Sequence, residues 1–135
     1  MKNILNFSEA FNIGLHAMAV LGVSDTKKIP VKDLAKTICA SDNHLSKVMQ
    51  RLSKANLVSS INGPSGGFFI IKPVDSIRIL DIYEAIEGNL PVSNCMFLKK
   101  ICNKKYCPMG TLIEQVSNTV LNYFSNTKLS EIIKQ

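Results

Sequence analysis

The feature that most constrains the fold is a glycine-rich segment between two short apolar runs, Asn62-Gly63-Pro64-Ser65-Gly66-Gly67. The run before it, 57–61, has three apolar residues and two serines, and the run after it, 68–71, is apolar throughout. Glycine and proline at this density mark a turn, and strand-like runs on both sides of a turn are typical of a β-hairpin. We therefore predict an antiparallel hairpin with a glycine-rich tip.

Two short helices are predicted directly before this hairpin. Pro30 suits the start of a helix that ends near Cys39 or Ala40, and Ser41 or Asp42 can cap the next helix. Helical spacing turns four apolar residues of the second helix inward: Leu45, Val48, Met49 and Leu52. Its other face is polar and basic, as in a helix-turn-helix. Helix, helix, strand, glycine-rich turn and strand together predict a winged helix-turn-helix.

Helices are also expected on both sides of this unit. Ser8 caps a first helix that we expect to stop at Gly22. Asp75 or Ser76 opens a further helix, which ends at Gly88. Because 135 residues can bury one core but not two, a single DNA-binding unit is predicted.

A long helix is predicted to start at Pro108, followed by a short helix near residues 129–133. The apolar face of the long helix is wider than a small core can cover, so we expect a second copy of the chain to cover the rest. That face consists of Leu112, Ile113, Val116, Val120, Leu121 and Phe124. The predicted fold is mainly α with a small β-hairpin. It divides into a DNA-binding domain (1–88), a cysteine loop (89–108), and a dimerisation helix with its tail (109–135).

Charge is distributed unevenly along the chain, whose net charge is +6. Residues 25–54 contain seven basic and three acidic residues, a local balance of +4 that suits a phosphate-facing surface but also an ordinary solvated face. Three groups of residues are expected to contact DNA: Asn43, His44 and Lys47 at base edges, Arg51 and Lys54 at phosphates, and Asn62, Ser65 and Gly66 in the wing. With no long apolar run or export signal, we expect a cytoplasmic protein without a membrane segment.

Three cysteines, Cys95, Cys102 and Cys107, lie within thirteen residues of the predicted loop. A reducing cytoplasm disfavours disulfides, thiolates are soft metal ligands, and the neighbouring lysines would lower their pKa. A metal site is therefore predicted, with free inert cysteines or zinc as alternatives, although no C-x2-C pair completes a zinc site. The fourth cysteine, Cys39, is expected to be a buried core thiol.

Residues 55–68, Ala-Asn-Leu-Val-Ser-Ser-Ile-Asn-Gly-Pro-Ser-Gly-Gly-Phe, resemble the wing signature of the IscR/NsrR family of bacterial repressors. Residues 80–88 resemble that family's next helix, and Cys107-Pro108 resembles the start of its dimerisation helix. The resemblance implies that the three loop cysteines ligate an Fe–S cluster whose state controls DNA binding. We expect a 4Fe–4S rather than a 2Fe–2S cluster.

This sequence departs from the family pattern at three places. The cysteine spacing is C-x6-C-x4-C instead of C-x5-C-x5-C, Gly110 stands where one branch has a histidine ligand, and Asn62 replaces a frequent wing arginine. Glu9 matches the place from which the nitric-oxide-sensing branch takes a fourth ligand in the partner subunit. A carboxylate holds iron more weakly than thiolate does, so the resemblance implies a cluster that senses nitric oxide or oxidants. A plain helix-terminal acid remains the alternative for Glu9.

The sequence thus predicts a homodimeric repressor that binds a palindromic operator in double-stranded DNA. One alternative is a cluster-free repressor of the same fold that responds to thiol chemistry or a metabolite, as in the family's cysteine-metabolism branch. Another is an Fe–S electron carrier, which the winged-helix pattern disfavours. An enzyme is not expected, because the chain has no nucleophile-base pair and its glycine-rich segment joins two strands.

Overall fold

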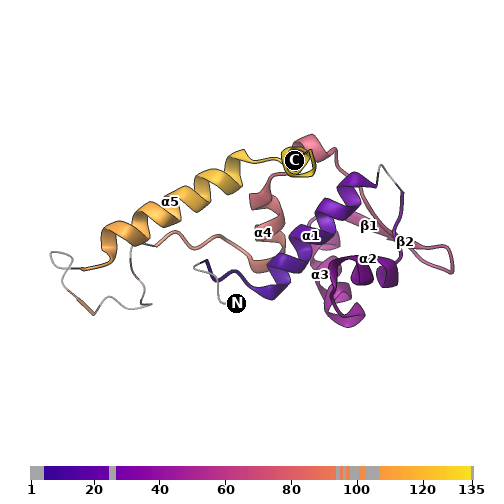
Figure 1. Ribbon diagram of the computed structural model, residues 1–135, viewed down its shortest axis with the longest axis horizontal. Coiled ribbons are helices and arrows are strands. Elements are labelled where there is room, and N and C mark those ends of the chain that lie inside the picture. The colour runs from indigo at the N-terminus through magenta and orange to yellow at the C-terminus, as the bar shows by residue number, and fades with distance from the viewer. Residues whose placement is uncertain are drawn as a thin grey trace.

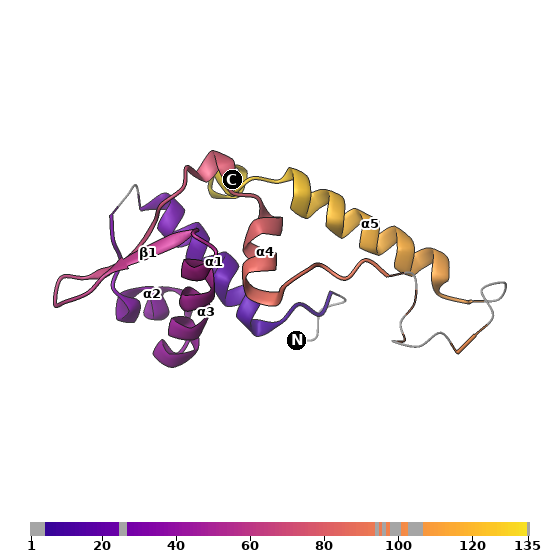
Figure 2. The same cartoon turned by 180° about the vertical axis from the view of Figure 1, so that it is seen from behind.

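The computed structural model describes residues 5–24, 27–93, 95, 97, 101–102 and 107–134. A helical body carries the hairpin at one end and a long helix at the other, as two opposite views show (Figures 1 and 2). The elements are α1 (Glu9–Val23), α2 (Val31–Ile38), α3 (Asp42–Lys54), β1 (Val58–Ile61), β2 (Gly67–Ile70), the 3-10 turn η1 (Val74–Ser76), α4 (Ile79–Glu87), α5 (Gly110–Asn126) and α6 (Leu129–Ile133). The predicted fold, mainly α with one antiparallel hairpin, is confirmed.

The core lies where α1, α3 and α4 pack together, with α2 and α6 against its sides. The four apolar residues of α3 that helical spacing turned inward are all buried. Other fully buried side chains are Phe11, Met18, Leu34, Ile77, Ile82 and Leu129. Burial of this apolar surface is the main stabilisation of the fold.

The first helix begins as predicted and ends two residues later than predicted. The Phe11 amide donates to the Ser8 hydroxyl at 3.0 Å, which caps the helix. Gly22 does not stop α1, because Ser24 ends it, with its amide and hydroxyl both bonded to the Leu21 carbonyl. Gly22 instead lies within the helix beside Ile133 of α6.

The start of α4 also differs from the prediction. Ser76 closes a turn, with its hydroxyl donating to the Pro73 carbonyl at 2.7 Å, and does not cap the helix. Ile77 is extended, and its carbonyl accepts a hydrogen bond from the Leu129 amide at 2.7 Å. This bridge to the α5–α6 connection delays the helix until Ile79. The predicted end at Gly88 is confirmed, where a φ of +84° suits glycine.

The hairpin pairs β1 with β2 in the register Val58 with Ile70 to Ile61 with Gly67. A third segment joins it, because Ile29 and Phe68 exchange two backbone hydrogen bonds of 2.9 Å each. Gly67 permits this close approach, since a Cβ there would lie 2.5 Å from the carbonyl carbon of Ile29. The wing is therefore fastened to the chain just before α2.

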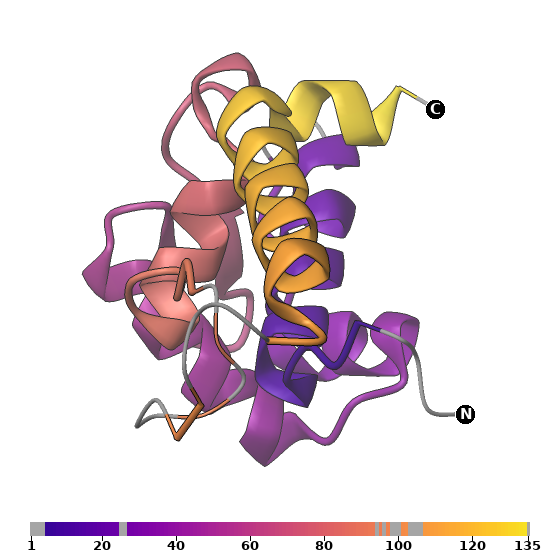
Figure 3. The same ribbon diagram turned by 90° about the vertical axis from the view of Figure 1, so that its left-hand side faces the viewer.

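The long helix α5 packs against the core through its C-terminal part. Phe124 packs against the rings of Phe7, Phe11 and Tyr83, with centroid distances of 5.6, 5.6 and 5.8 Å. From there α5 extends away from the body, and Figure 3 shows it in front of α1 and α4. It begins at Gly110, two residues after the predicted Pro108. None of the helices in the described parts of the chain is long and apolar enough to cross a membrane.

Candidate DNA-binding surface and cysteine pocket

Helix α3 has the form expected of a recognition helix. The Ser41 hydroxyl accepts a hydrogen bond from the His44 amide at 3.1 Å, so Ser41 is the N-cap. Asn43 and Lys47 are exposed near the start of the helix, and His44 is half-buried beside them. The N-terminal part of such a helix is the part that reaches base edges in the major groove.

The two basic residues of the last turn differ in their surroundings. Arg51 is exposed, but its Nη1 donates to the carbonyl of Ile86 in α4 at 3.0 Å. Lys54 is exposed at the end of the helix. The side chain of Arg51 therefore joins α3 to α4, whereas that of Lys54 is exposed at the end of α3.

The residues of the wing tip divide into exposed side chains and turn positions. Asn62 and Ser65 are exposed at the tip. Gly66 is buried, and its amide donates to the Gly63 carbonyl at 3.0 Å. A Cβ at Gly66 would lie 2.0 Å from the Ile61 carbonyl oxygen, so only glycine fits there. Gly66 can thus offer only backbone to DNA.

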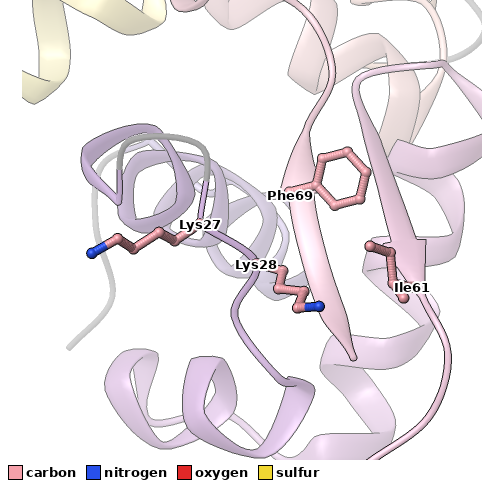
Figure 4. Close-up of a pocket in the computed structure, with 4 residues that line it drawn as sticks. All are labelled: Lys27, Lys28, Ile61 and Phe69. Carbon is pink, nitrogen blue, oxygen red and sulfur yellow. The ribbon is translucent and has the colours of Figure 1, made fainter. Parts of the chain in front are cut away.

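A depression of about 480 Å³ lies between the wing and the segment before α2 (Figure 4). Ile61 and Phe69 line it from the two strands, and Lys27 and Lys28 line it from the neighbouring segment. In Figure 4 Lys28 extends toward the hairpin and Lys27 away from it. Both lysines belong to the basic stretch 25–54, but their position beside the wing could not be predicted from the sequence.

The three cysteines of the connecting segment share one pocket near the start of α5. Its volume is about 190 Å³. The lining residues are Cys95, Phe97, Ile101, Cys102, Cys107, Pro108, Met109 and Ile113. Apart from the thiols the lining is apolar, as suits a group that is to be shielded from water. The three predicted ligands therefore line the same pocket.

The thiols also affect one another. The pKa of Cys102 is raised by desolvation, then by the charge and hydrogen bond of Cys107, and by the charge of Cys95. The side chain of Cys102 is exposed, so its interaction with the other two thiols is what matters for the site. A lowered pKa was expected from the lysine pairs 99–100 and 104–105. Those lysines lie outside the described residues, and at Cys102 the pKa moves the opposite way.

The thiols are not yet arranged as a finished metal site. Within the described residues no group of three or more His, Cys, Asp or Glu side chains is set to hold a metal ion. The donor set nevertheless fits an iron–sulfur group, because three soft thiols surround one apolar pocket.

Two further predictions concerned the proposed fourth ligand, Glu9, and the fourth cysteine, Cys39. Glu9 is exposed in the first turn of α1, and its neighbour Ser8 donates a hydrogen bond to the Glu87 carboxylate at the end of α4. Cys39 was predicted to be buried, and this is wrong. It is exposed at the end of α2, where the tight turn before α3 requires a left-handed residue (φ +57°).

Along α5 a row of apolar side chains faces solvent. Leu112 is 50% exposed, Val116 40% and Tyr123 54%. A neighbouring cavity of about 220 Å³ lies between α5, α4 and the N-terminal segment, lined in part by Phe7 and Val120. An exposed apolar stripe of this kind is typical of a surface that another chain covers.

A helix-turn-helix whose second helix is exposed, followed by a glycine-tipped hairpin, defines a winged-helix DNA-binding protein. Residues 7–135 match the model of the Rrf2 family, which is described as iron-dependent transcriptional regulators. The chain belongs to this family. It is a transcriptional regulator and not an enzyme, and the predicted resemblance to IscR-type regulators is confirmed.

Individual relatives agree with this assignment. The chain is 28% identical over 130 residues to a putative HTH-type transcriptional regulator of Aquifex aeolicus (strain VF5), covering 94% of this chain and 90% of that protein. It is 26% identical over 110 residues to the HTH-type transcriptional regulator IscR of Enterobacter sp. (strain 638), covering 82% and 68%.

Two solved structures share the fold. CymR, the global cysteine regulator of B. subtilis, has a TM-score of 0.78 at 24% identity and covers 97% of this chain and 98% of its own. IscR of T. potens has a TM-score of 0.73 at 20% identity, covering 97% and 88%. At these identities the likeness shows the fold alone.

Proposed function

We propose that this regulator is a homodimeric repressor whose affinity for DNA is set by an Fe–S cluster. Cys95, Cys102 and Cys107 would hold the cluster, and Glu9 of the partner subunit would supply the fourth ligand. The observation that carries the proposal is that all three loop thiols line one apolar pocket. The family's description as iron-dependent is in keeping with it.

The chain's own residues would set the reactivity of the cluster. Phe97, Ile101 and Ile113 line the pocket beside the thiols with apolar side chains, and a carboxylate at the fourth position is a weaker ligand than a thiolate. When bound, a cluster with such a corner supplies iron that reacts with nitric oxide or oxidants. A 4Fe–4S form is proposed over a 2Fe–2S form, and iron content per subunit distinguishes the two.

On the DNA side, the proposed base contacts are Asn43, His44 and Lys47, and Lys54 contacts phosphate. Asn62, Ser65 and the Gly66 backbone approach the neighbouring groove from the wing. Two recognition helices related by a two-fold axis require a palindromic operator with half-sites about one helical turn apart. We place the protein in the cytoplasm, where its DNA target lies, and divide the chain into 1–88 for DNA, 89–108 for the cluster and 109–135 for dimerisation.

A cluster-free regulator is the second candidate, and the structural likeness to the cysteine regulator CymR favours it. In that case the three thiols of the pocket would themselves respond to oxidants, or the protein would bind a metabolite. Iron and sulfide content separates the two candidates.

The test is anaerobic purification followed by iron and sulfide quantitation and a visible spectrum. The variants to compare are Cys102→Ser and Cys39→Ser, since Cys39 is an exposed cysteine that does not line the pocket. We expect wild type and Cys39→Ser to hold iron and sulfide in equal amounts and Cys102→Ser to lose most of both. A wild-type protein that stays colourless after reconstitution under reducing conditions would contradict the cluster and leave the thiol regulator.

A further inference from the structure

We infer that Arg51 is a positioning residue that ties the recognition helix α3 to the last turn of α4, rather than the phosphate contact its place in the sequence suggests. Its Nη1 donates to the Ile86 carbonyl at 3.0 Å across 35 positions of sequence. The last carbonyls of a helix lack partners within it and carry the negative end of the helix dipole. A guanidinium there satisfies both needs, so the contact is favourable for α4 as well as for α3.

The same residue of α4 is held from a second side. The Ile86 side chain is 5% exposed and packs over Gly14 of α1, where a Cβ would lie 2.1 Å from its Cδ1. That Cβ would also lie 3.2 Å from Cγ1 of Val48, which is on α3 one turn before Arg51. Ile86 thus contacts α1 through its side chain and α3 through its carbonyl. A shift of this turn must move the recognition helix or break the hydrogen bond.

The turn is also where the chain leaves for the cysteines. Gly88 ends α4 only two residues after Ile86, and Cys95 follows seven residues later. The adjacent Glu87 accepts a hydrogen bond from Ser8, next to Glu9. In the proposed dimer, the end of α4 therefore borders the segment that leads to this subunit's cysteines and the start of α1, whose Glu9 would ligate the partner's cluster. Arg51 passes the state of this junction to α3, a role that rests in part on the proposed cluster function.

The experiment compares Arg51→Lys and Arg51→Gln with Lys54→Gln, which removes the charge of the proposed phosphate contact at the exposed end of the same helix. Each variant is titrated, metal-free, against two duplexes of equal length at several salt concentrations. One duplex is enriched by the wild-type protein from a random-sequence pool, and the other is unrelated. Circular dichroism establishes that each variant is folded.

A lost phosphate contact lowers the slope of log affinity against log salt by about 1 and weakens both duplexes alike. We expect that result for Lys54→Gln. For both Arg51 variants we expect an unchanged slope, unchanged binding of the unrelated duplex, and about tenfold weaker binding of the enriched duplex. Arg51→Lys is the sharper variant, because it keeps the charge but cannot reproduce the guanidinium geometry.

The inference is overturned if Arg51→Gln lowers the slope as Lys54→Gln does, or if Arg51→Lys binds both duplexes like wild type. A second measurement uses the ratio of affinities between cluster-loaded and metal-free protein. We expect this ratio to approach one in Arg51→Lys while the iron content stays at the wild-type level, and a ratio equal to that of wild type would overturn the inference. Absence of iron in the wild type would overturn the cluster proposal alone, since the salt measurement needs no metal.

Discussion

The substitution Gly67→Ala should break the attachment of the wing to the segment before α2. An added Cβ would lie 2.5 Å from the carbonyl carbon of Ile29, 2.6 Å from its oxygen and 2.8 Å from the Pro30 nitrogen. These are backbone atoms, so no side-chain rotation relieves the overlap. The chain must separate there, and the two hydrogen bonds between Ile29 and Phe68 are lost.

The expected loss follows from those two effects. Overpacking costs about 1–3 kcal/mol, and each hydrogen bond contributes about 0.5–1.5 kcal/mol. We therefore expect the free energy of unfolding to fall by about 3 kcal/mol, which for a chain of this size corresponds to a Tm lower by about 10 °C. Thermal and urea unfolding followed by circular dichroism measure both quantities.

Gly22→Ala is the matched control, because the same substitution is made where a Cβ fits. Gly22 lies inside α1, and its Cβ would meet Ile133 Cδ1 at 3.4 Å, an ordinary contact. Alanine is a better helix former than glycine by about 1 kcal/mol, so this variant should be more stable than wild type. A Gly67→Ala variant with unchanged Tm, or two variants that shift in the same direction, would refute the packing argument.

Two further predictions concern the ion pair of α4 and the surface of α5. Burial raises the pKa of Asp81, but the hydrogen bonds and charge of Arg78 outweigh it and hold the pKa below its usual value. This carboxylate therefore stabilises the fold above the unfolded pKa of about 4. Its stabilising effect is lost as the pH falls through the folded pKa. Urea unfolding should therefore show Asp81→Asn to be about 1 kcal/mol less stable than wild type at pH 7, and this difference should disappear in acid. A difference in the free energy of unfolding that persists in acid would contradict the charge argument. Asp75→Asn, on the exposed η1 turn, is the control. If α5 forms the proposed dimer, Val116→Lys should sediment as a folded monomer, whereas Asn118→Lys, also exposed on α5, should sediment as a dimer like the wild type. A Val116→Lys dimer would show that the apolar stripe serves another purpose.

The order of elements could be predicted from the sequence because each signal acts locally. Ser8 and Ser41 cap their helices through their own hydroxyls, Gly88 takes a positive φ, and the inward residues of α3 follow helical spacing. These features depend on neighbours within four residues. Hairpin strands were placed to within one residue for the same reason.

The predictions failed where contacts distant in sequence decide the structure. Asp75 and Ser76 resemble helix caps, but Ile77 bonds to Leu129 and keeps the chain extended. Gly22 resembles a helix end, although α1 continues past it beside Ile133 of α6. The hydrogen bond of Arg51 could not be predicted either, because its partner, the Ile86 carbonyl, is 35 residues away.

The spacing of Cys95, Cys102 and Cys107 predicted a metal site, and the three residues line one pocket. The cysteine spacing could not predict which apolar side chains line this pocket together with the thiols. Phe97 and Ile101 come from the loop itself, whereas Ile113 comes from α5, whose position depends on the packing of Phe124 far down the helix.

The central claim, that a cysteine-held cluster sets DNA affinity, is tested most directly by one anaerobic titration. The purified protein is bound to its enriched duplex, and fluorescence anisotropy and the visible spectrum are recorded together while stoichiometric nitric oxide is added. The account predicts that the charge-transfer absorption is bleached and that DNA is released over the same range of nitric oxide, and that Cys102→Ser shows neither change. DNA binding that stays constant while the absorption is bleached would contradict the claim.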